Sequence, residues 1–167
     1  MGEIVSVPLD ILSPEPLSAA HSVDGFSCGE SVLDDWLKRR ALANQASRAS
    51  RTFVVTNREG QVMGYCALST GAVAHADATG GVRRNMPDPI PVLVLGRLAV
   101  DHRAQGMKLG ASLLKDAAHR SMAVSANAGV RALLVHALHD RAKDFYLKYG
   151  FGSSPTDPMT LMLRLPG

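Results

Sequence analysis

The sequence predicts an α/β fold, with a single domain spanning residues 1–167. Segments with the apolar pattern of strands alternate along the chain with segments whose apolar residues recur at helical spacing. The clearest case runs from Pro91 to Leu114, where an apolar run typical of a strand leads through a glycine-bearing turn into a helical pattern. A chain of 167 residues, 46% of them hydrophobic, is large enough to bury a real core.

The first half of the chain predicts a strand, a helix and a hairpin. Residues 3–20 are interrupted by prolines, which indicates one short strand and a loop. The segment from Gly29 to Gln45 predicts a helix, because its apolar residues recur at helical spacing with basic residues on the polar side. Residues 51–57 and 61–70 predict the two strands of a hairpin, joined by a turn that contains Gly60.

The second half predicts a long loop followed by alternating strands and helices. The loop spans His75 to Pro91 and contains two glycines and three prolines. Because long ordered loops are usually functional, we expect substrate recognition there. After the strand and helix of residues 92–122 come an apolar run over residues 132–137, an amphipathic helix over residues 140–151 and a last strand that ends at Leu165.

Composition narrows the cellular setting and the partners. The N-terminus lacks the pattern of a secretory signal and no stretch approaches the length of a membrane span, so we expect a cytoplasmic protein with no membrane partner. Cys28 and Cys66 have no framework spacing and are expected to be reduced and structural. The formal net charge of +3 and the isoelectric point near 9.1 lie at the threshold for suspecting a nucleic-acid partner.

The strand, turn and helix between Pro91 and Leu114 form a candidate phosphate site. Where a strand ends in a small-residue turn that opens a helix, unpaired backbone N–H groups and the positive end of the helix dipole meet, and such a place binds phosphate. A tight turn also needs glycine for steric reasons alone, so this pattern gains its meaning from the segments that follow it.

The decisive later segment is FYLKYGF, residues 145–151. Together with the glycine-bearing turn it resembles the GNAT acetyltransferases, which use acetyl-coenzyme A and show a Q/R-x-x-G-x-G/A turn opening a helix, then a strand, then a helix ending in FY-x-x-x-GF. The order and spacing of these parts cover the chain from about Arg51 to its end. The resemblance implies a GNAT fold: a central mixed, largely antiparallel sheet with splayed middle strands and flanking helices.

Longer stretches narrow this resemblance. Residues 29–45, 51–55, 78–101 and 135–138 look very like the TacT/KacT-type acetyltransferase toxins of bacteria, which acetylate the amino group of aminoacyl-tRNA. The resemblance implies acetyl-coenzyme A as co-substrate, aminoacyl-tRNA as acceptor, no metal, a homodimer and an antitoxin partner of ribbon-helix-helix type. Translation would stall, because the capped amine cannot act as a nucleophile in peptide-bond formation. A preference for glycyl-tRNA is implied by the family alone.

Two alignments of the coenzyme motif compete at the turn. One begins at Arg103; the other begins at Gln105, has Lys108 in place of the middle glycine and ends at Gly110. We favour the second, because its register relative to the helix sets which N–H groups face the phosphates. A positive φ at Lys108 would cost about 1–2 kcal/mol, which its ammonium could offset at the pyrophosphate. The resemblance assigns coenzyme binding to Leu98, Ala99, Val100, Arg103, Gln105, Gly106, Met107, Lys108, Leu109, Gly110, Ala111 and Phe145.

The resemblance also assigns roles to the strand before the turn and to one tyrosine. In the family that strand carries a bulge that frees backbone groups for the coenzyme, here at residues 98–100, although a fully paired strand would show the same apolar pattern. Tyr146 would be the general acid that protonates the departing thiolate, since a phenol stays protonated at neutral pH. Aromatic residues at this spacing are usually core; Tyr149 is the second candidate for the acid and is expected to pack instead.

No side chain stands out as the general base. Glu30, Asp101 and His136 are candidates without a distinguishing context, and a histidine inside an apolar strand is more often a core residue. An α-amino group titrates near about 8, well below a lysine side chain, and an aminoacyl ester should titrate lower still. A site built for that amine can let water carry the proton.

Basic residues provide candidate contacts to a nucleic acid. Arg and Lys contact phosphates and position the nucleic acid without specifying its sequence, whereas a solvated helix face is the usual meaning of a run of charges. The candidate tRNA contacts are Lys38, Arg39, Arg40, Arg83, Arg84 and Asn85. Two alternative functions stay open: a GNAT enzyme acting on protein N-termini or small amines, and a non-catalytic acyl-coenzyme A-binding module, for which Lys108 in the coenzyme motif is the hint.

Overall fold

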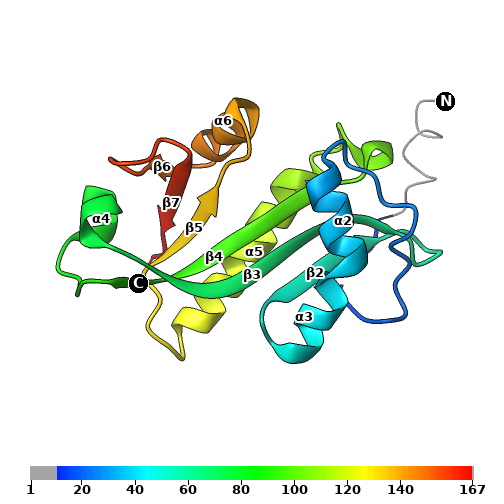
Figure 1. The fold of residues 1–167 in the computed structure, drawn as a ribbon, viewed down its shortest axis with the longest axis horizontal. Coiled ribbons are helices and arrows are strands. Elements are labelled where there is room, and N and C mark those ends of the chain that lie inside the picture. The colour runs from blue at the N-terminus through cyan, green and yellow to red at the C-terminus, as the bar shows by residue number, and fades with distance from the viewer. Residues whose placement is uncertain (1–10, 167) are drawn as a thin grey trace. The chain divides into compact units, whose positions relative to one another are not determined.

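The computed structural model describes residues 11–166. Seven strands form one sheet in the order β1-β2-β3-β4-β5-β7-β6 (Figure 1). Their bounds are β1 Glu15–Pro16, β2 Arg51–Thr56, β3 Val62–Val73, β4 Ile90–Val100, β5 Ala132–His136, β6 Gly152–Ser153 and β7 Thr160–Arg164. The β4–β5 ladder is parallel, whereas β1–β2, β2–β3, β5–β7 and β6–β7 are antiparallel. The predicted mixed, largely antiparallel sheet is therefore confirmed.

The contacts divide the chain into two compact units. Among the described residues, the first unit contains residues 11–68 and 97–116, and the second contains residues 69–96 and 117–166. Strands β3 and β4 and the helix α5 (Leu109–Ser125) each contribute residues to both units. Each unit has its own hydrophobic cluster.

The first unit corrects one predicted helix. The helix expected over residues 29–45 is broken into α2 (Ser31–Arg39) and α3 (Ala41–Ser47). Arg40 lies between them with φ −122° and ψ −33°, so its backbone leaves the helical conformation for one residue. Neither glycine nor proline marks the break, and the periodicity continues across it because Leu37 and Ala41 are both buried. The apolar periodicity of the sequence therefore did not reveal the break between α2 and α3.

The core of the first unit packs α2 against the predicted hairpin, which the structure confirms as β2 and β3. Leu33 and Leu37 of α2 join Val54 and Tyr65 in one hydrophobic cluster. The Tyr65 ring stacks on Trp36 at 6.0 Å, and its hydroxyl donates to the carbonyl of Leu33 at 2.7 Å. This aromatic stack fixes α2 on the strands, beside which α2 and α3 lie in Figure 1.

The second unit corrects the loop predicted over residues 75–91. This segment contains a short 3-10 helix, η2 (His75–Asp77), and the helix α4 (Gly80–Arg83). The Thr79 hydroxyl caps α4 by accepting from the N–H of Val82. The Arg131 guanidinium donates to the carbonyls of Gly81, Val82 and Arg84 at 3.0–3.2 Å. A side chain 47 to 50 residues away in sequence thus orders the segment, which local patterns could not indicate.

The remaining elements complete the second unit. The helix α6 (Asp140–Lys148) ends three residues earlier than the predicted segment, because Gly150 adopts φ +95°. The predicted N-terminal strand is β1, whereas residues 3–10 of that prediction lie outside the described residues. Within residues 11–166, no helix has the length and apolarity needed to cross a membrane.

Candidate active site

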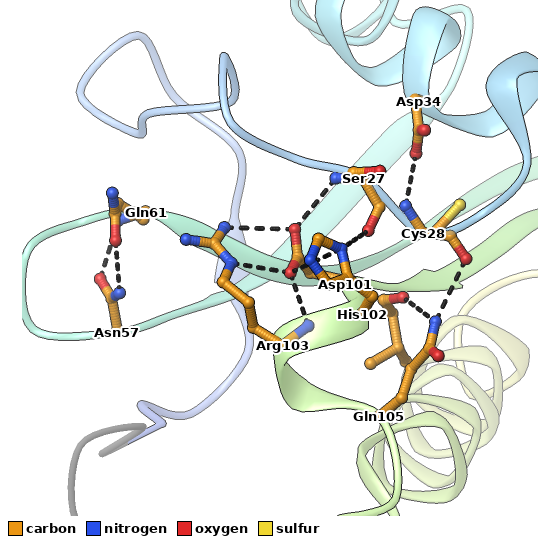
Figure 2. Close-up of polar contacts among 10 residues, drawn as sticks. Ser27, Cys28, Asp34, Asn57, Gln61, Asp101, His102, Arg103 and Gln105 are labelled. Atoms are coloured by element: carbon orange, nitrogen blue, oxygen red, sulfur yellow. Dashed lines mark hydrogen bonds and ion pairs between the residues drawn. The ribbon is translucent and has the colours of Figure 1, made fainter.

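The coenzyme turn of the first unit, residues 101–111, begins at a buried carboxylate. Asp101 directly follows β4 and has no exposed surface. Its oxygens accept from the backbone N–H groups of Ser27 and Arg103, each at 2.9 Å, and from the Arg103 guanidinium at 2.8 and 3.2 Å (Figure 2). Asp101 therefore ties the end of the strand, the segment before α2 and the start of the turn together.

The electrostatics of Asp101 match this supporting role. Burial raises the pKa of the carboxyl, but the hydrogen bonds from the Arg103 side chain, the Arg103 backbone and Ser27 outweigh it, so the net pKa is lowered. The carboxylate is thus ionised and fully engaged at neutral pH. Among the three base candidates, Asp101 forms a structural ion pair, and its partner is the Arg103 guanidinium.

The backbone of the turn is strained at the residue that departs from the family motif. Gly106 and Lys108 both have positive φ, at +85° and +61°. The first helical bond of α5 runs from the N–H of Ser112 to the carbonyl of Lys108, at 3.1 Å. Glycine is favoured at a left-handed residue, so the geometry fits the first glycine position of either alignment, Gly106 or Lys108.

Gln105 holds the turn in place, and the turn itself is open to solvent. The Gln105 amide donates to the carbonyls of Cys28 at 3.1 Å and Val100 at 3.0 Å (Figure 2). Residues 105–108 are exposed, including Met107 at 40%. The N–H groups at the start of α5 have no intrahelical partner, because the first four of any helix lack one. The turn therefore presents donors and a helix dipole toward solvent, as an anion site requires.

Pairing along β4 changes partway through the strand. Its parallel ladder with β5 covers Val92 to Leu95 and ends at the Leu95–Val135 pair. The predicted coenzyme residues Leu98, Ala99 and Val100 lie beyond this ladder, with Leu98 and Val100 half-buried and Ala99 buried. No described residue of β5 is paired with them. This arrangement is compatible with backbone groups that are free for another partner.

In the second unit, the FYLKYGF segment builds a helix cap. Gly150 donates its N–H to the carbonyl of Leu147 at 3.1 Å, and Phe151 donates to the carbonyl of Tyr146 at 3.2 Å. These two bonds around a left-handed glycine form a Schellman motif, which is completed by a hydrophobic contact between its ends. The rings of Tyr146 and Phe151 lie 5.4 Å apart, and those of Phe145 and Tyr146 lie 5.3 Å apart. The motif spacing is therefore explained by the cap, which orients Tyr146.

A cavity of about 410 Å³ lies in the second unit. Its floor comes from β3, β4 and β5, with Val73, Val94 and Leu134 among the apolar lining residues, and its acidic residues are Asp77 and Asp157. The loop of residues 154–160 is joined to Asp77 by the Thr156 hydroxyl, which donates to the Asp77 carboxylate at 2.6 Å. A cavity of this size can hold a small organic group.

His136 lines this cavity at the end of β5. Its side chain is not a buried core group, since the residue is exposed. Its Nδ1 lies 3.0 Å from the Thr160 hydroxyl, which in turn donates to Asp157 at 2.8 Å. Local sequence provides no context for His136, because Thr160 and Asp157 are 24 and 21 residues away along the chain. Glu30, the remaining base candidate, precedes α2 as its N-cap residue.

The predicted tRNA contacts lie at two helix ends. Lys38, Arg39 and Arg40 are exposed at the end of α2 in the first unit. Arg83, Arg84 and Asn85 are exposed at the end of α4 in the second unit, where Asn85 has φ +60°. Sequence reasoning missed the basic residues Arg131 and Arg164 in the second unit. Desolvation and then the charges of Arg164 and Arg84 lower the pKa of Arg131.

Two further features concern the cysteines and the side chains that could hold a metal ion. Neither Cys28 nor Cys66 forms a disulfide, and burial together with the neighbouring Asp34 raises the pKa of Cys28 to about 11. Its thiol is therefore protonated and unreactive at neutral pH. Among residues 11–166, no group of three or more His, Cys, Asp or Glu side chains is placed to hold a metal ion.

The exposed turn at the N-terminus of α5 in the first unit and the capped aromatic helix α6 in the second are the two segments by which the sequence resembles the GNAT acetyltransferases. The chain belongs to this family, because the family model described as acetyltransferase (GNAT) domain matches residues 49–152. The chain is also 55% identical, over 153 residues and 92% of each chain, to the tRNA-acetylating toxin of Mycobacterium tuberculosis.

Solved structures with the same fold add ligands and partners. AtaT complexed with acetyl-methionyl-tRNAfMet is 27% identical with a TM-score of 0.86, over 93% of this chain and 95% of that chain. A tyrosine-to-phenylalanine mutant of AtaT, bound to the C-terminus of the antitoxin AtaR and to acetyl-CoA, is 26% identical with a TM-score of 0.79, over 93% and 94%. The predicted resemblance to tRNA-acetylating toxins is thereby confirmed.

Proposed function

We propose that this protein transfers an acetyl group from acetyl-coenzyme A to the α-amino group of aminoacyl-tRNA and thereby blocks translation. The observation that carries the proposal is the 55% identity, over 92% of each chain, with a relative named for acetylating tRNA. The structural likeness to AtaT, which was solved with an acetylated aminoacyl-tRNA, supports the same acceptor class. An acylated α-amine has no free lone pair for peptide-bond formation, which is why the product would stall translation.

Acetyl-coenzyme A is the proposed donor, and the first unit has the features that it needs. The exposed residues 105–108 and the N-terminus of α5 suit the pyrophosphate. Leu98, Ala99 and Val100 lie beyond the ladder with β5, so their backbone groups suit the pantetheine arm and the acetyl carbonyl. An acetyl-CoA complex of AtaT supports this donor. Arg103 is engaged with Asp101, and its proposed part is to hold the turn rather than to bind phosphate.

Tyr146 is the proposed general acid. The chain supplies a phenol on a helix whose end is fixed by the Schellman cap, and the residue is 8% exposed. When the amine attacks the thioester carbon, the new C–N bond forms and the C–S bond breaks, so the sulfur leaves with the electron pair. Tyr146 donates its proton to that sulfur, which prevents the thiolate from attacking back.

The acceptor and partner surfaces are proposed from charge and from the relatives. Arg83, Arg84 and Asn85 would contact tRNA phosphates, with Arg131 and Arg164 adding positive charge, and Lys38, Arg39 and Arg40 would form a second basic patch. We also propose a homodimer, a cytoplasmic location and an antitoxin of ribbon-helix-helix type that binds the toxin through its tail. The complex of AtaT with the C-terminus of AtaR supports an antitoxin of this general kind.

The experiment that tests the function offers the purified protein several acceptors in parallel. Charged tRNA, uncharged tRNA, a peptide with a free N-terminus and a free amino acid each receive acetyl-coenzyme A, and mass spectrometry follows N-acetylation after nuclease digestion. We expect acetylation of charged tRNA alone, on its amino acid. Rapid acetylation of the peptide instead would support the alternative N-terminal acetyltransferase, and coenzyme binding without any transfer would support the non-catalytic module.

A further inference from the structure

The hydrogen-bond chain beside the cavity fixes where the His136 protons lie. The oxygen of the Thr160 hydroxyl lies 2.8 Å from an oxygen of the Asp157 carboxylate. The hydroxyl has one proton, and the ionised carboxylate can only accept, so the hydroxyl donates to Asp157. The N–H of Met159 and then the Thr160 hydroxyl lower the pKa of Asp157, so this carboxylate is ionised at neutral pH. The hydroxyl oxygen must therefore accept from its other neighbour, which is Nδ1 of His136 at 3.0 Å.

This direction of hydrogen bonding leaves a base at the other side of the ring. In a neutral imidazole, one nitrogen carries the proton and the other carries a lone pair. With the proton held on Nδ1 by Thr160, the lone pair of His136 is on Nε2. No hydrogen bond to Nε2 is found within the described part of the chain, and the side chain lines the cavity.

The place of His136 in the sheet suits a proton acceptor. The ladder between β4 and β5 ends at Leu95 and Val135, so Gly96 and His136 are the first residues beyond it on either strand. A Cβ built on Gly96 would meet no atom within 4 Å, which means that open space adjoins the strand there.

We propose that His136 is a catalytic residue that takes the proton from the attacking α-amino group, with Thr160 and Asp157 as positioning residues. This inference rests on the proposed function and adds the proton acceptor that the sequence left open. The amine nitrogen bonds to the acetyl carbon and gives its proton to Nε2, while the sulfur leaves with the C–S electrons and takes its proton from Tyr146. Exchange with solvent then restores the neutral imidazole and the phenol.

The charges around the cavity favour an amine as the occupant. Asp77 and Asp157 are the acidic groups that line it, and no other charged side chain among the described residues does so besides His136 when protonated. Negative charge attracts the ammonium form of an aminoacyl group, which must then lose a proton before it attacks. The cavity therefore attracts the aminoacyl amine, and after the neutral form attacks, His136 takes the proton that the nitrogen loses.

The test uses the full chain with charged tRNA and acetyl-coenzyme A, and follows kcat/KM against pH. His136→Asn keeps an amide N–H where Nδ1–H donates to Thr160, but it has no base. We expect kcat/KM to fall by about 10²-fold, the lower end for a positioned acid or base. Thr160→Val should cause a smaller loss of kcat/KM, whereas Thr160→Ser should keep the wild-type rate because it keeps the hydroxyl. The matched control is His119→Asn, because His119 is an exposed histidine on α5.

The pH profile separates a base from a structural residue. If both the amine and His136 must be neutral, log(kcat/KM) of the wild type approaches a slope of 2 on the acid side, whereas His136→Asn should retain only the slope of 1 from the amine. A wild-type rate and slope in His136→Asn would overturn this inference alone. If the wild type acetylates no charged tRNA, both the proposed function and this inference are overturned. Should His136→Asn fail to fold, equal rates for Thr160→Val and Thr160→Ser would overturn the relay.

Discussion

The coenzyme turn of the first unit and the cavity of the second unit present different parts of the chain to solvent. At the turn, the groups on offer are backbone N–H groups, and their directions depend on the positive φ angles of Gly106 and Lys108. In the cavity, the polar groups are side chains, with His136, Thr160 and Asp157 joined in one hydrogen-bond chain. A substitution can alter a site made of backbone N–H groups only by changing the backbone strain or the residues that hold the backbone. A site made of side chains can be altered by direct substitution while the fold stays intact.

The two regions also differ in how they are held. Buried Asp101 holds the turn through an ion pair and backbone donors, so the turn depends on a charge inside the protein. Tyr146 is held by a cap that uses its carbonyl and its ring. We therefore expect substitutions near the turn to alter stability and coenzyme affinity, and substitutions in the second unit to alter turnover or acceptor binding.

The largest expected effect is on turnover, from Tyr146→Phe. The phenylalanine keeps the ring and the carbonyl of the cap, so folding and coenzyme affinity should stay the same while kcat falls by about 10²–10⁴-fold. Release of the coenzyme A thiol measures kcat, and calorimetry measures affinity. Tyr149→Phe is the matched control, because Tyr149 is 40% exposed and should affect neither quantity. An unchanged kcat in Tyr146→Phe would remove the tyrosine from the mechanism.

The second effect is on stability, from Asp101→Asn. Removal of one partner of a buried ion pair costs roughly 3–5 kcal/mol, and the half-exposed Arg103 side chain places this case near about 3. Urea unfolding measures the loss, and Asp24→Asn, an exposed aspartate of the same unit, should change stability little. A stable Asp101→Asn variant with normal coenzyme affinity would show that the turn does not depend on this carboxylate.

The stability that the Asp101 ion pair contributes should depend on pH, and the direction of this dependence follows from the pKa of the carboxyl. Because the folded pKa is below the ordinary carboxyl value, the ion pair stabilises the protein above that value, about 4. The stabilisation is lost as pH falls through the lowered folded pKa. The difference in unfolding free energy between wild type and Asp101→Asn should therefore shrink below pH of about 4, and a difference that grew with acidity would contradict the assigned pairing.

The third effect is on acceptor binding, from replacing Arg83 and Arg84 together with Ala. KM for charged tRNA should rise about tenfold, and the slope of log affinity against log salt should flatten by about 0.7–0.9 for each phosphate that the variant no longer neutralises. KM for acetyl-coenzyme A should not change. The control pair Lys115→Ala and Arg141→Ala removes the same charge from exposed positions elsewhere. If both double variants weaken tRNA binding equally, net charge rather than the end of α4 is responsible.

The smallest effect concerns strain at Lys108. Lys108→Gly should relieve about 1–2 kcal/mol of left-handed strain, less about 0.5–1 for the flexibility of glycine, for a net gain near 0.5–1 kcal/mol. Arg48→Gly relieves the same strain at φ +67° outside the turn and is the matched control. Weaker coenzyme binding in Lys108→Gly alone would show that the ammonium holds a phosphate; tighter binding would show that the lysine is a strained departure.

Several features were predictable because local patterns carry them. The hairpin of β2 and β3, the strand β4, the turn and the start of α5 follow from apolar periodicity and glycine positions, and the structure places them as predicted. The break at Arg40 and the helix α4 were not predictable, since the first interrupts a continuous burial pattern and the second is held by Arg131. The role proposed for His136 depends on Thr160 and Asp157, which no spacing rule connects to it.

By itself the sequence determined the fold class, the family and the order of the site segments, because strand, turn and helix signals are local and the FYLKYGF spacing matches a helix cap. Only the tertiary structure decided which polar groups are engaged and which are available. Arg103 has the sequence context of a coenzyme ligand, yet it pairs with Asp101, and His136 has that of a core residue, yet it lines a cavity. Hydrogen-bond partners are chosen by proximity in space, and strand pairing brings together residues that the chain keeps far apart.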